Sequence, residues 1–130
     1  MSMRISLAVA SFAAAALLAA TPAAATQGLS CRPISGSGPI VGLVIGGAGL
    51  AGVNLTEGRT TRSTMGPNPP IALRQSWIDE DRFWVDLTDP NFMEDLGRLR
   101  LHLTGRGHAR HLTGTFVQRG RLYRLSCEES

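Results

Sequence analysis

Residues 98–104 have the sequence Arg-Leu-Arg-Leu-His-Leu-Thr, in which polar and apolar side chains alternate without a break. Side chains along a β-strand point alternately to the two faces of a sheet, so this pattern predicts a half-buried strand. The leucines are expected to face a core and the basic side chains to face water: Leu99, Leu101 and Leu103 on one side, and Arg98, Arg100 and His102 on the other. The segment therefore indicates an antiparallel sheet with one face in solvent.

The segments on either side of this strand predict two hairpins. Residues 71–78 and 82–88 are rich in aromatic and β-branched side chains, and the acidic tripeptide between them suits a solvated turn. Residues 112–118 and 121–127 predict two further strands, joined by an Arg-Gly dipeptide that is typical of tight turns. In the second of these four strands the expected faces are Phe83, Val85 and Leu87 on one side, and Arg82, Trp84 and Asp86 on the other.

The N-terminal half of the chain predicts fewer strands. Residues 40–45 and 50–55 are apolar runs separated by a glycine cluster, which predicts two buried strands or one hairpin. Residues 57–70 are polar and contain three prolines, so we expect a long surface loop. Residues 26–39 are rich in Gly, Ser and Pro and predict an extended arm.

One short helix is expected at about residues 90–96. Asp89 suits the N-cap, Pro90 suits the first helical position and Gly97 would end the helix, with Phe92, Met93 and Leu96 on its apolar side. With about seven strands, the sequence predicts a mainly β domain: a small antiparallel β-sandwich or barrel with one short helix.

The first 25 residues are expected to be a cleaved signal peptide, which leaves a single small β-rich domain over residues 26–130. A positive start, an apolar run over residues 5–20 and the small residues Ala23-Ala24-Ala25 form the three parts of a secretory leader. A retained membrane anchor is less favoured, because a membrane-spanning helix needs about 20 apolar residues and the apolar run over residues 5–20 is shorter. Lipidation is also less favoured, because Leu29 is misplaced in the segment before Cys31. The sequence therefore predicts export to the periplasm or beyond, with no transmembrane segment in the mature chain.

Two cysteines, Cys31 and Cys127, lie near the two ends of the expected domain. Exported proteins meet an oxidising environment, and the pair has no CxxC or metal-ligand spacing. We expect a structural disulfide that ties the two termini together.

All 13 basic side chains other than histidine are arginines, and their distribution is uneven. Residues 26–95 contain five arginines and eight acidic residues, whereas residues 96–127 contain seven arginines, three histidines and no acid. Guanidinium groups bind carboxylates and phosphates with two parallel hydrogen bonds. The candidate ligand-binding residues are therefore Arg98, Arg100, Arg121 and Arg124. Alternatively, these basic strands pair with the acidic region 79–95 or remain solvated.

Other chemical signals are weak. Residues 47–52 match GxGxxG, but a polar loop stands where a dinucleotide-binding fold needs a helix, so we expect glycines that allow close strand packing or a tight turn. His102, His108 and His111 lack a ligand spacing and have arginines around them, so no metal site is expected. No arrangement of nucleophile, base or paired carboxylates indicates catalysis, and no cofactor is expected.

These features favour an exported, non-enzymatic domain that binds an envelope protein or another envelope component. A second hypothesis is that the arginine face binds an anionic glycan or lipid, in which case charge reversal at Arg98 and Arg100 should weaken binding. A third is inhibition of a secreted hydrolase, since many such inhibitors are small, exported and disulfide-linked. Nucleic acid is not an expected partner of an exported chain.

Overall fold

The alternating segments form β-strands in the computed structural model, which describes residues 27–107 and 110–130. Nine strands lie within these residues: β1 (Gln27–Pro33), β2 (Ile40–Gly46), β3 (Gly49–Glu57), β4 (Thr60–Ser63), β5 (Ala72–Ile78), β6 (Arg82–Thr88), β7 (Asp95–Thr104), β8 (His111–Gln118) and β9 (Arg121–Glu129). The mainly β, antiparallel prediction is confirmed.

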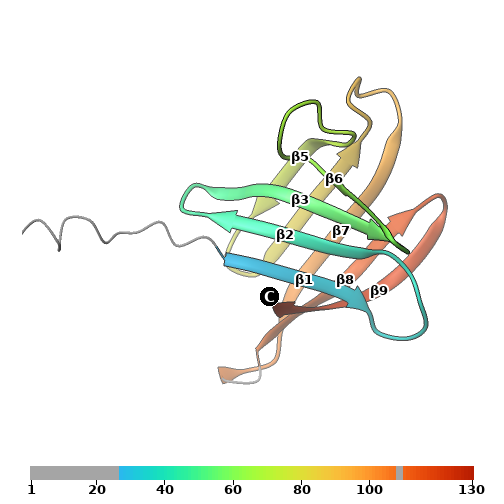
Figure 1. Cartoon of the computed structure of the whole chain (residues 1–130). Helices are drawn as coiled ribbons and strands as arrows, with labels where there is room; N and C mark the ends of the chain where they lie inside the picture. The colour runs from blue at the N-terminus through green and yellow to red at the C-terminus, as the bar shows by residue number, and fades with distance from the viewer. Residues whose placement is uncertain (1–26, 108–109) are drawn as a thin grey trace, which may run out of the picture.

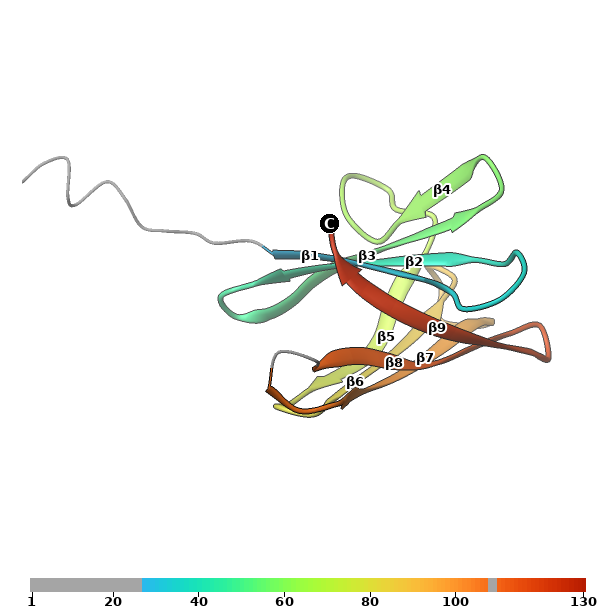
Figure 2. The same cartoon turned by 90° about the horizontal axis from the view of Figure 1, so that it is seen from below.

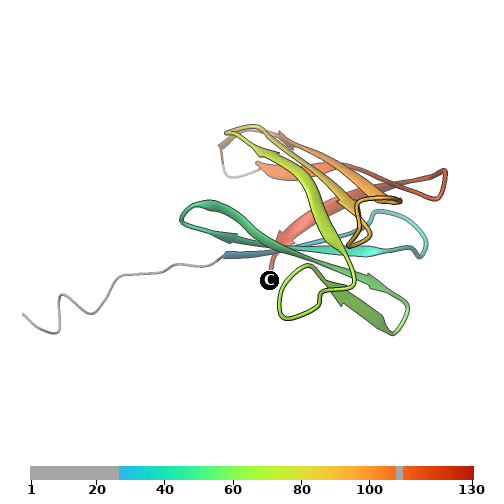
Figure 3. The same cartoon turned by 90° about the horizontal axis from the view of Figure 1, so that it is seen from above.

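The described strands form one sheet in the order β4-β3-β2-β1-β9-β8-β7-β6-β5. Each strand is antiparallel to its neighbours, and β1 pairs with both β2 and β9. Figure 1 shows β1, β2 and β3 crossing in front of the other strands, and Figure 2 shows β9 passing from one layer to the other. On the opposite side, β5 approaches β3, which leaves a nearly closed barrel (Figure 3).

The inward-facing side chains of both layers form the core, as the alternation predicts. Leu99 and Leu101 are fully buried, and Leu103 is half-buried. Val85 and Leu87 of β6 are also buried, together with Phe116 of β8. The two arginines and the histidine of β7 lie on the outer face of the sheet, which is open to solvent.

The predicted disulfide is present between Cys31 and Cys127, with an S–S distance of 2.04 Å. The two cysteines are direct cross-strand partners in β1 and β9. Both are buried in the core cluster. The bond therefore joins the first strand of the domain to the last one.

The prediction of a short helix at about residues 90–96 is wrong. The chain forms a loop over residues 89–94, and β7 begins at Asp95. Asp89 accepts hydrogen bonds from the backbone N–H groups of Met93 and Glu94, four and five residues further on rather than the two or three of an N-cap, and Phe92 has a φ of 58°, outside the helical region. Since β6 and β7 are adjacent antiparallel strands, the connection is a hairpin loop.

Two other expectations need correction. The arm expected at residues 26–39 contains β1, which is paired on both sides, and the loop expected at residues 57–70 contains the short strand β4.

The GxGxxG segment spans the turn between β2 and β3, as the turn interpretation predicts. The predicted signal peptide, residues 1–25, lies outside the described residues.

Candidate functional site

The outer face of β5, β6 and β7 has a hollow of about 420 Å³. Cross-strand pairing builds it, because Trp77 of β5 lies opposite Trp84 of β6, and Trp84 lies opposite Arg100 of β7. Trp77 and Trp84 are 56% and 42% exposed, respectively. The hollow is lined by Gln75, Ser76, Trp77, Arg82, Trp84, Asp86 and Arg100, which we call the Trp-Arg hollow.

Trp84 is held between two arginines. The guanidinium carbon of Arg82 lies 5.4 Å from the centre of the Trp84 ring, and that of Arg100 lies 5.2 Å from it. Both distances are within the range of cation–π attraction. Two cations are thus fixed beside an aromatic surface that remains partly open to solvent.

Asp86 anchors the other side of the hollow. It is only 7% exposed, and it accepts hydrogen bonds from Arg100 (2.8 Å) and from the side-chain amide of Gln75 (2.7 Å). Burial raises the pKa of Asp86, but the hydrogen bonds from Arg100 and Gln75 and the nearby arginine charges outweigh it and hold this pKa below its usual value. Asp86 is therefore an anion at neutral pH.

Asp79, in the turn between β5 and β6, fixes both Trp77 and Arg82. It accepts a hydrogen bond from the indole N–H of Trp77 at 3.1 Å and one from the Arg82 guanidinium at 3.1 Å. The Trp77 hydrogen bond is the main cause that lowers the pKa of Asp79 to about 2, followed by the bond from the backbone N–H of Asp81. The exposed indole of Trp77 is therefore held in one orientation.

These contacts leave the Trp-Arg hollow organised before any ligand arrives. Aromatic faces provide apolar contact, the guanidinium groups provide donors for an anion, and the amide and carboxylate provide further polar partners. A few oriented polar groups around an aromatic surface are the usual composition of a small-ligand site.

The arginines predicted from the sequence do not all lie together. Arg100 lines the Trp-Arg hollow, and Arg124 lies on the same outer face, since Thr115 pairs with both residues. Arg98 is paired with Asp95 at 3.2 Å and lines a separate, smaller hollow of about 240 Å³. Arg121 lies on the other side of β9, over the ring of Tyr123.

The separation of Arg121 from Arg124 follows from strand geometry. The two residues are three positions apart, and an odd spacing places side chains on opposite faces of a strand. Tyr123, two positions from Arg121, packs against the core cluster. Pairing of the basic strands with the acidic region is also observed, in Arg100–Asp86 and Arg98–Asp95.

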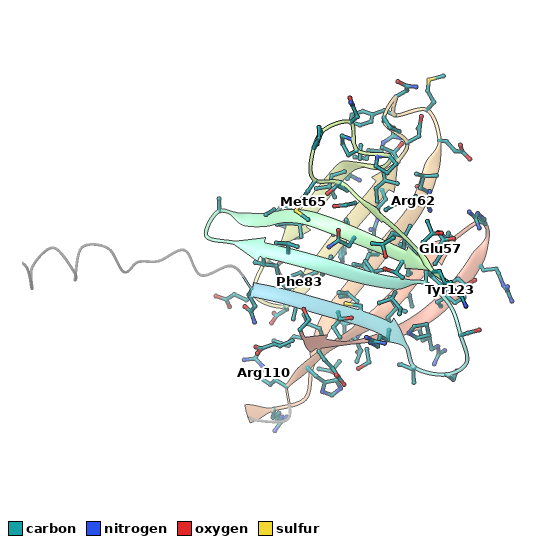
Figure 4. The ribbon with its side chains drawn as sticks, viewed as in Figure 1. Glu57, Arg62, Met65, Phe83, Arg110 and Tyr123 are labelled. Atoms are coloured by element: carbon teal, nitrogen blue, oxygen red, sulfur yellow. A yellow bond between two sulfur atoms is a disulfide. The ribbon has the colours of Figure 1, made fainter. Side chains whose placement is uncertain are left out.

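A second hollow of about 430 Å³ lies at one end of the barrel, where Glu57 and Tyr123 line it (Figure 4). Its central carboxylate, Glu57, accepts hydrogen bonds from Arg62 at 2.8 Å and from Gln118 at 2.7 Å. These bonds link β3, β4 and β8, so the polar groups here hold the end of the barrel together.

The described residues contain no group of three His, Cys, Asp or Glu side chains that would hold a metal ion, and His108 lies outside them. His102 is exposed on β7, and the ring of His111 lies 3.3 Å from the hydroxyl of Thr104.

Within residues 27–107 and 110–130, no helix has the length and apolar character needed to span a membrane.

Comparison of the chain with protein-family models, with curated proteins and with solved structures gives no significant match. The Trp-Arg hollow is therefore the feature of the molecule that points to a function.

The low pKa of Asp79 predicts how this hollow responds to acid. A carboxylate whose pKa is lowered in the folded state stabilises that state above its unfolded pKa of about 3.9, and the contribution is lost as pH falls through the folded value. The indole N–H resonance of Trp77 should therefore be constant from pH 7 to pH 4 and shift with a midpoint near pH 2, in line with the pKa of about 2.

Two acidic residues of the same turn provide the test variant and its control. Asp79→Asn should abolish this titration. Asp81→Asn should leave it unchanged, because the carboxylate of Asp81 lies 4.0 Å from the guanidinium of Arg110. An unaltered titration in the Asp79→Asn protein would assign the transition to another group.

Proposed function

We propose that the protein is an exported, non-catalytic binding domain that binds an anionic envelope glycan in the Trp-Arg hollow. The observation that carries this proposal is the pairing of Trp77 with Trp84 on an exposed sheet face, with Arg82 and Arg100 beside the second indole. Trp77 is fixed by its hydrogen bond to Asp79 and Trp84 by the two guanidinium groups, and exposed aromatic surface of this kind marks an interaction site.

The lining groups match the chemistry of an acidic sugar. Sugar rings have apolar C–H faces that pack on an indole, and their hydroxyl groups exchange hydrogen bonds with side chains such as Gln75 and Asp86. A carboxylate or phosphate on the sugar would take the remaining donors of Arg82 and Arg100. A neutral sugar would leave those cations without a new partner.

The carboxylate in the hollow supports binding rather than hydrolysis. Glycosidases use two carboxyl groups, one of them with a raised pKa so that it can donate a proton. Asp86 is the acidic residue lining the Trp-Arg hollow, and its pKa is lowered. It is suited to orient Arg100 and to accept a hydroxyl hydrogen bond.

Export is supported by the Cys31–Cys127 disulfide, because such bonds persist mainly in oxidising compartments. The leader-like sequence of the first 25 residues supports the same conclusion. The proposed ligand is therefore one available in the envelope or outside the cell.

Tryptophan fluorescence tests the proposal directly, because both tryptophans of the chain lie in the hollow. We expect a saturable fluorescence change when the oxidised protein is titrated with an oligosaccharide of uronic acids. A neutral oligosaccharide of equal length should bind much more weakly. Vesicles of phosphatidylglycerol distinguish the glycan from an anionic lipid, and saturable binding to vesicles alone would overturn the glycan assignment.

Two arginines of β7 provide a matched pair of variants. Arg100→Gln should weaken binding of the uronic acid oligosaccharide about ten-fold or more, since a hydrogen bond to a charged group is worth about 1.5–3 kcal/mol. Arg98→Gln, on the same face but outside the hollow, should have an effect of less than about two-fold. Calorimetry measures the dissociation constant of each variant for the oligosaccharide. Equal losses of affinity in the two variants would indicate a general charge effect.

A further inference from the structure

The loop between β6 and β7 exposes two large apolar side chains that the Trp-Arg hollow does not use. Phe92 is 54% exposed and Met93 is 84% exposed. They are consecutive residues at the tip of the hairpin, which extends beyond the barrel at the top of Figure 1. A single exposed apolar side chain is ordinary, but two large ones on consecutive residues of a loop tip are a feature that needs an explanation.

The backbone of this loop is held in one strained conformation. Phe92 has a φ of 58°, in the left-handed region that aromatic residues rarely adopt. Such strain persists only where surrounding contacts enforce it, and it is concentrated at functional sites. The conformation exposes the Phe92 ring, so packing of that ring in the core does not account for the strain.

Hydrogen bonds to Asp89 enforce the conformation. Its carboxylate accepts the backbone N–H groups of Met93 at 2.7 Å and Glu94 at 2.6 Å, and that of Asn91 at 3.3 Å. The Glu94 carbonyl accepts the backbone N–H of Asp89 and the hydroxyl of Thr88, at 3.2 and 2.8 Å. Hydrogen bonds to the Asp89 carboxylate and to the Glu94 carbonyl therefore fix the two ends of the loop, and its apolar tip is pre-organised. A pre-organised tip loses little conformational freedom when it binds.

The charges around the tip indicate what it contacts. The chain has no basic residue between Arg82 and Arg98, whereas Asp89, Glu94 and Asp95 lie in or beside the loop. Asp89 is engaged by the loop and Asp95 by Arg98, which leaves the exposed Glu94 next to the apolar pair. An anionic lipid surface would repel this tip. A protein pocket with an apolar base and a lysine or arginine at its rim would complement it.

We propose that Phe92 and Met93 form a rigid apolar probe that inserts into a pocket of a protein partner, with Glu94 contacting a basic residue at the rim. This surface is separate from the Trp-Arg hollow and does not depend on the proposed glycan function.

Site-specific photocrosslinking tests the proposal in the producing cell. A benzoylphenylalanine at position 93, where the side chain is almost fully exposed, should crosslink one predominant protein. The crosslinked residue of that protein should lie in an apolar pocket with a lysine or arginine at its rim. The absence of a protein crosslink, or a crosslinked site on a flat or acidic surface, would overturn the proposal.

Binding between the two purified proteins then separates a binding role of Phe92 from a structural one. Phe92→Asn should weaken the complex about ten-fold or more and should also raise the thermal midpoint of the free protein, since Asn tolerates a positive φ. A side chain that served only the fold would give a lower midpoint and unchanged binding.

Matched variants complete the test. Leu122→Ser, which removes a 59% exposed leucine on β9, should leave the complex unchanged. Glu94→Lys should weaken it, with an effect that decreases as salt rises. Binding of the protein to phosphatidylcholine vesicles that is lost in Phe92→Asn would instead identify a membrane as the target. None of these variants alters the Trp-Arg hollow, so oligosaccharide binding should persist in all of them.

Discussion

Leu101→Asp is expected to leave the domain unfolded, whereas His102→Asp should leave it folded. Leu101 is 1% exposed and faces the core from the middle of β7. A carboxylate there would have no partner, and burying it costs several kcal/mol or more. Small domains are stabilised by only about 5–15 kcal/mol in total, so one such change removes most or all of the stability.

His102, the next residue, supplies the matched control. It is exposed on the outer face and is the cross-strand partner of Arg82. An aspartate at position 102 stays in water and faces an opposite charge across the strand pair, which changes stability by about 1 kcal/mol or less. Circular dichroism with urea denaturation compares the two variants. Equal stabilities would mean that the inner and outer faces of β7 are reversed.

Removal of the disulfide is the second change with a large expected effect. The bond connects residues 96 positions apart, and the loop-closure model assigns about 4–5 kcal/mol to a loop of this size. The double variant Cys31→Ser/Cys127→Ser should therefore show a much lower urea midpoint than the oxidised protein. The effect is large because β1 carries the pairing between the N-terminal and C-terminal strands of the sheet.

Two comparisons check this result. Reduction and alkylation of the wild-type protein should lower the midpoint to a similar extent, because the same constraint is lost. Ser126→Ala, beside Cys127 in the same strand, should have little effect, since Ser126 lies outside the core cluster. A double variant as stable as the oxidised protein would mean that β1 is held by its backbone pairing alone.

Local sequence patterns determined most of the strands. Alternation in residues 98–104 specifies which side chains of β7 are buried, because the period of two is a property of the strand backbone itself. The hairpins β5–β6 and β8–β9 also follow from apolar runs separated by turn residues. The disulfide followed from the presence of two cysteines behind a leader-like N-terminal sequence.

Local patterns failed where the same residues suit two structures. Asp89 followed by Pro90 suits the first turn of a helix, but it also suits a closed loop in which the carboxylate accepts several backbone N–H groups. Only the position of β6 beside β7 decides between them, because adjacent antiparallel strands leave six residues for the connection. Similarly, the edge strand β4 becomes a strand only through its pairing with β3.

The candidate site shows the same division. The sequence by itself determined that Arg98 and Arg100 lie on the exposed face of β7 and that Trp84 shares a face with Asp86. It did not place Trp77 beside Trp84, because a shift of one residue in the β5–β6 register moves every side chain of a strand to the other face. In the folded structure the Asp79 turn fixes that register and places Trp77 beside Trp84, which in turn lies opposite Arg100. Cross-strand contacts depend on register, and register is set by the geometry of the turn and by the paired strand, neither of which the alternation within one strand specifies.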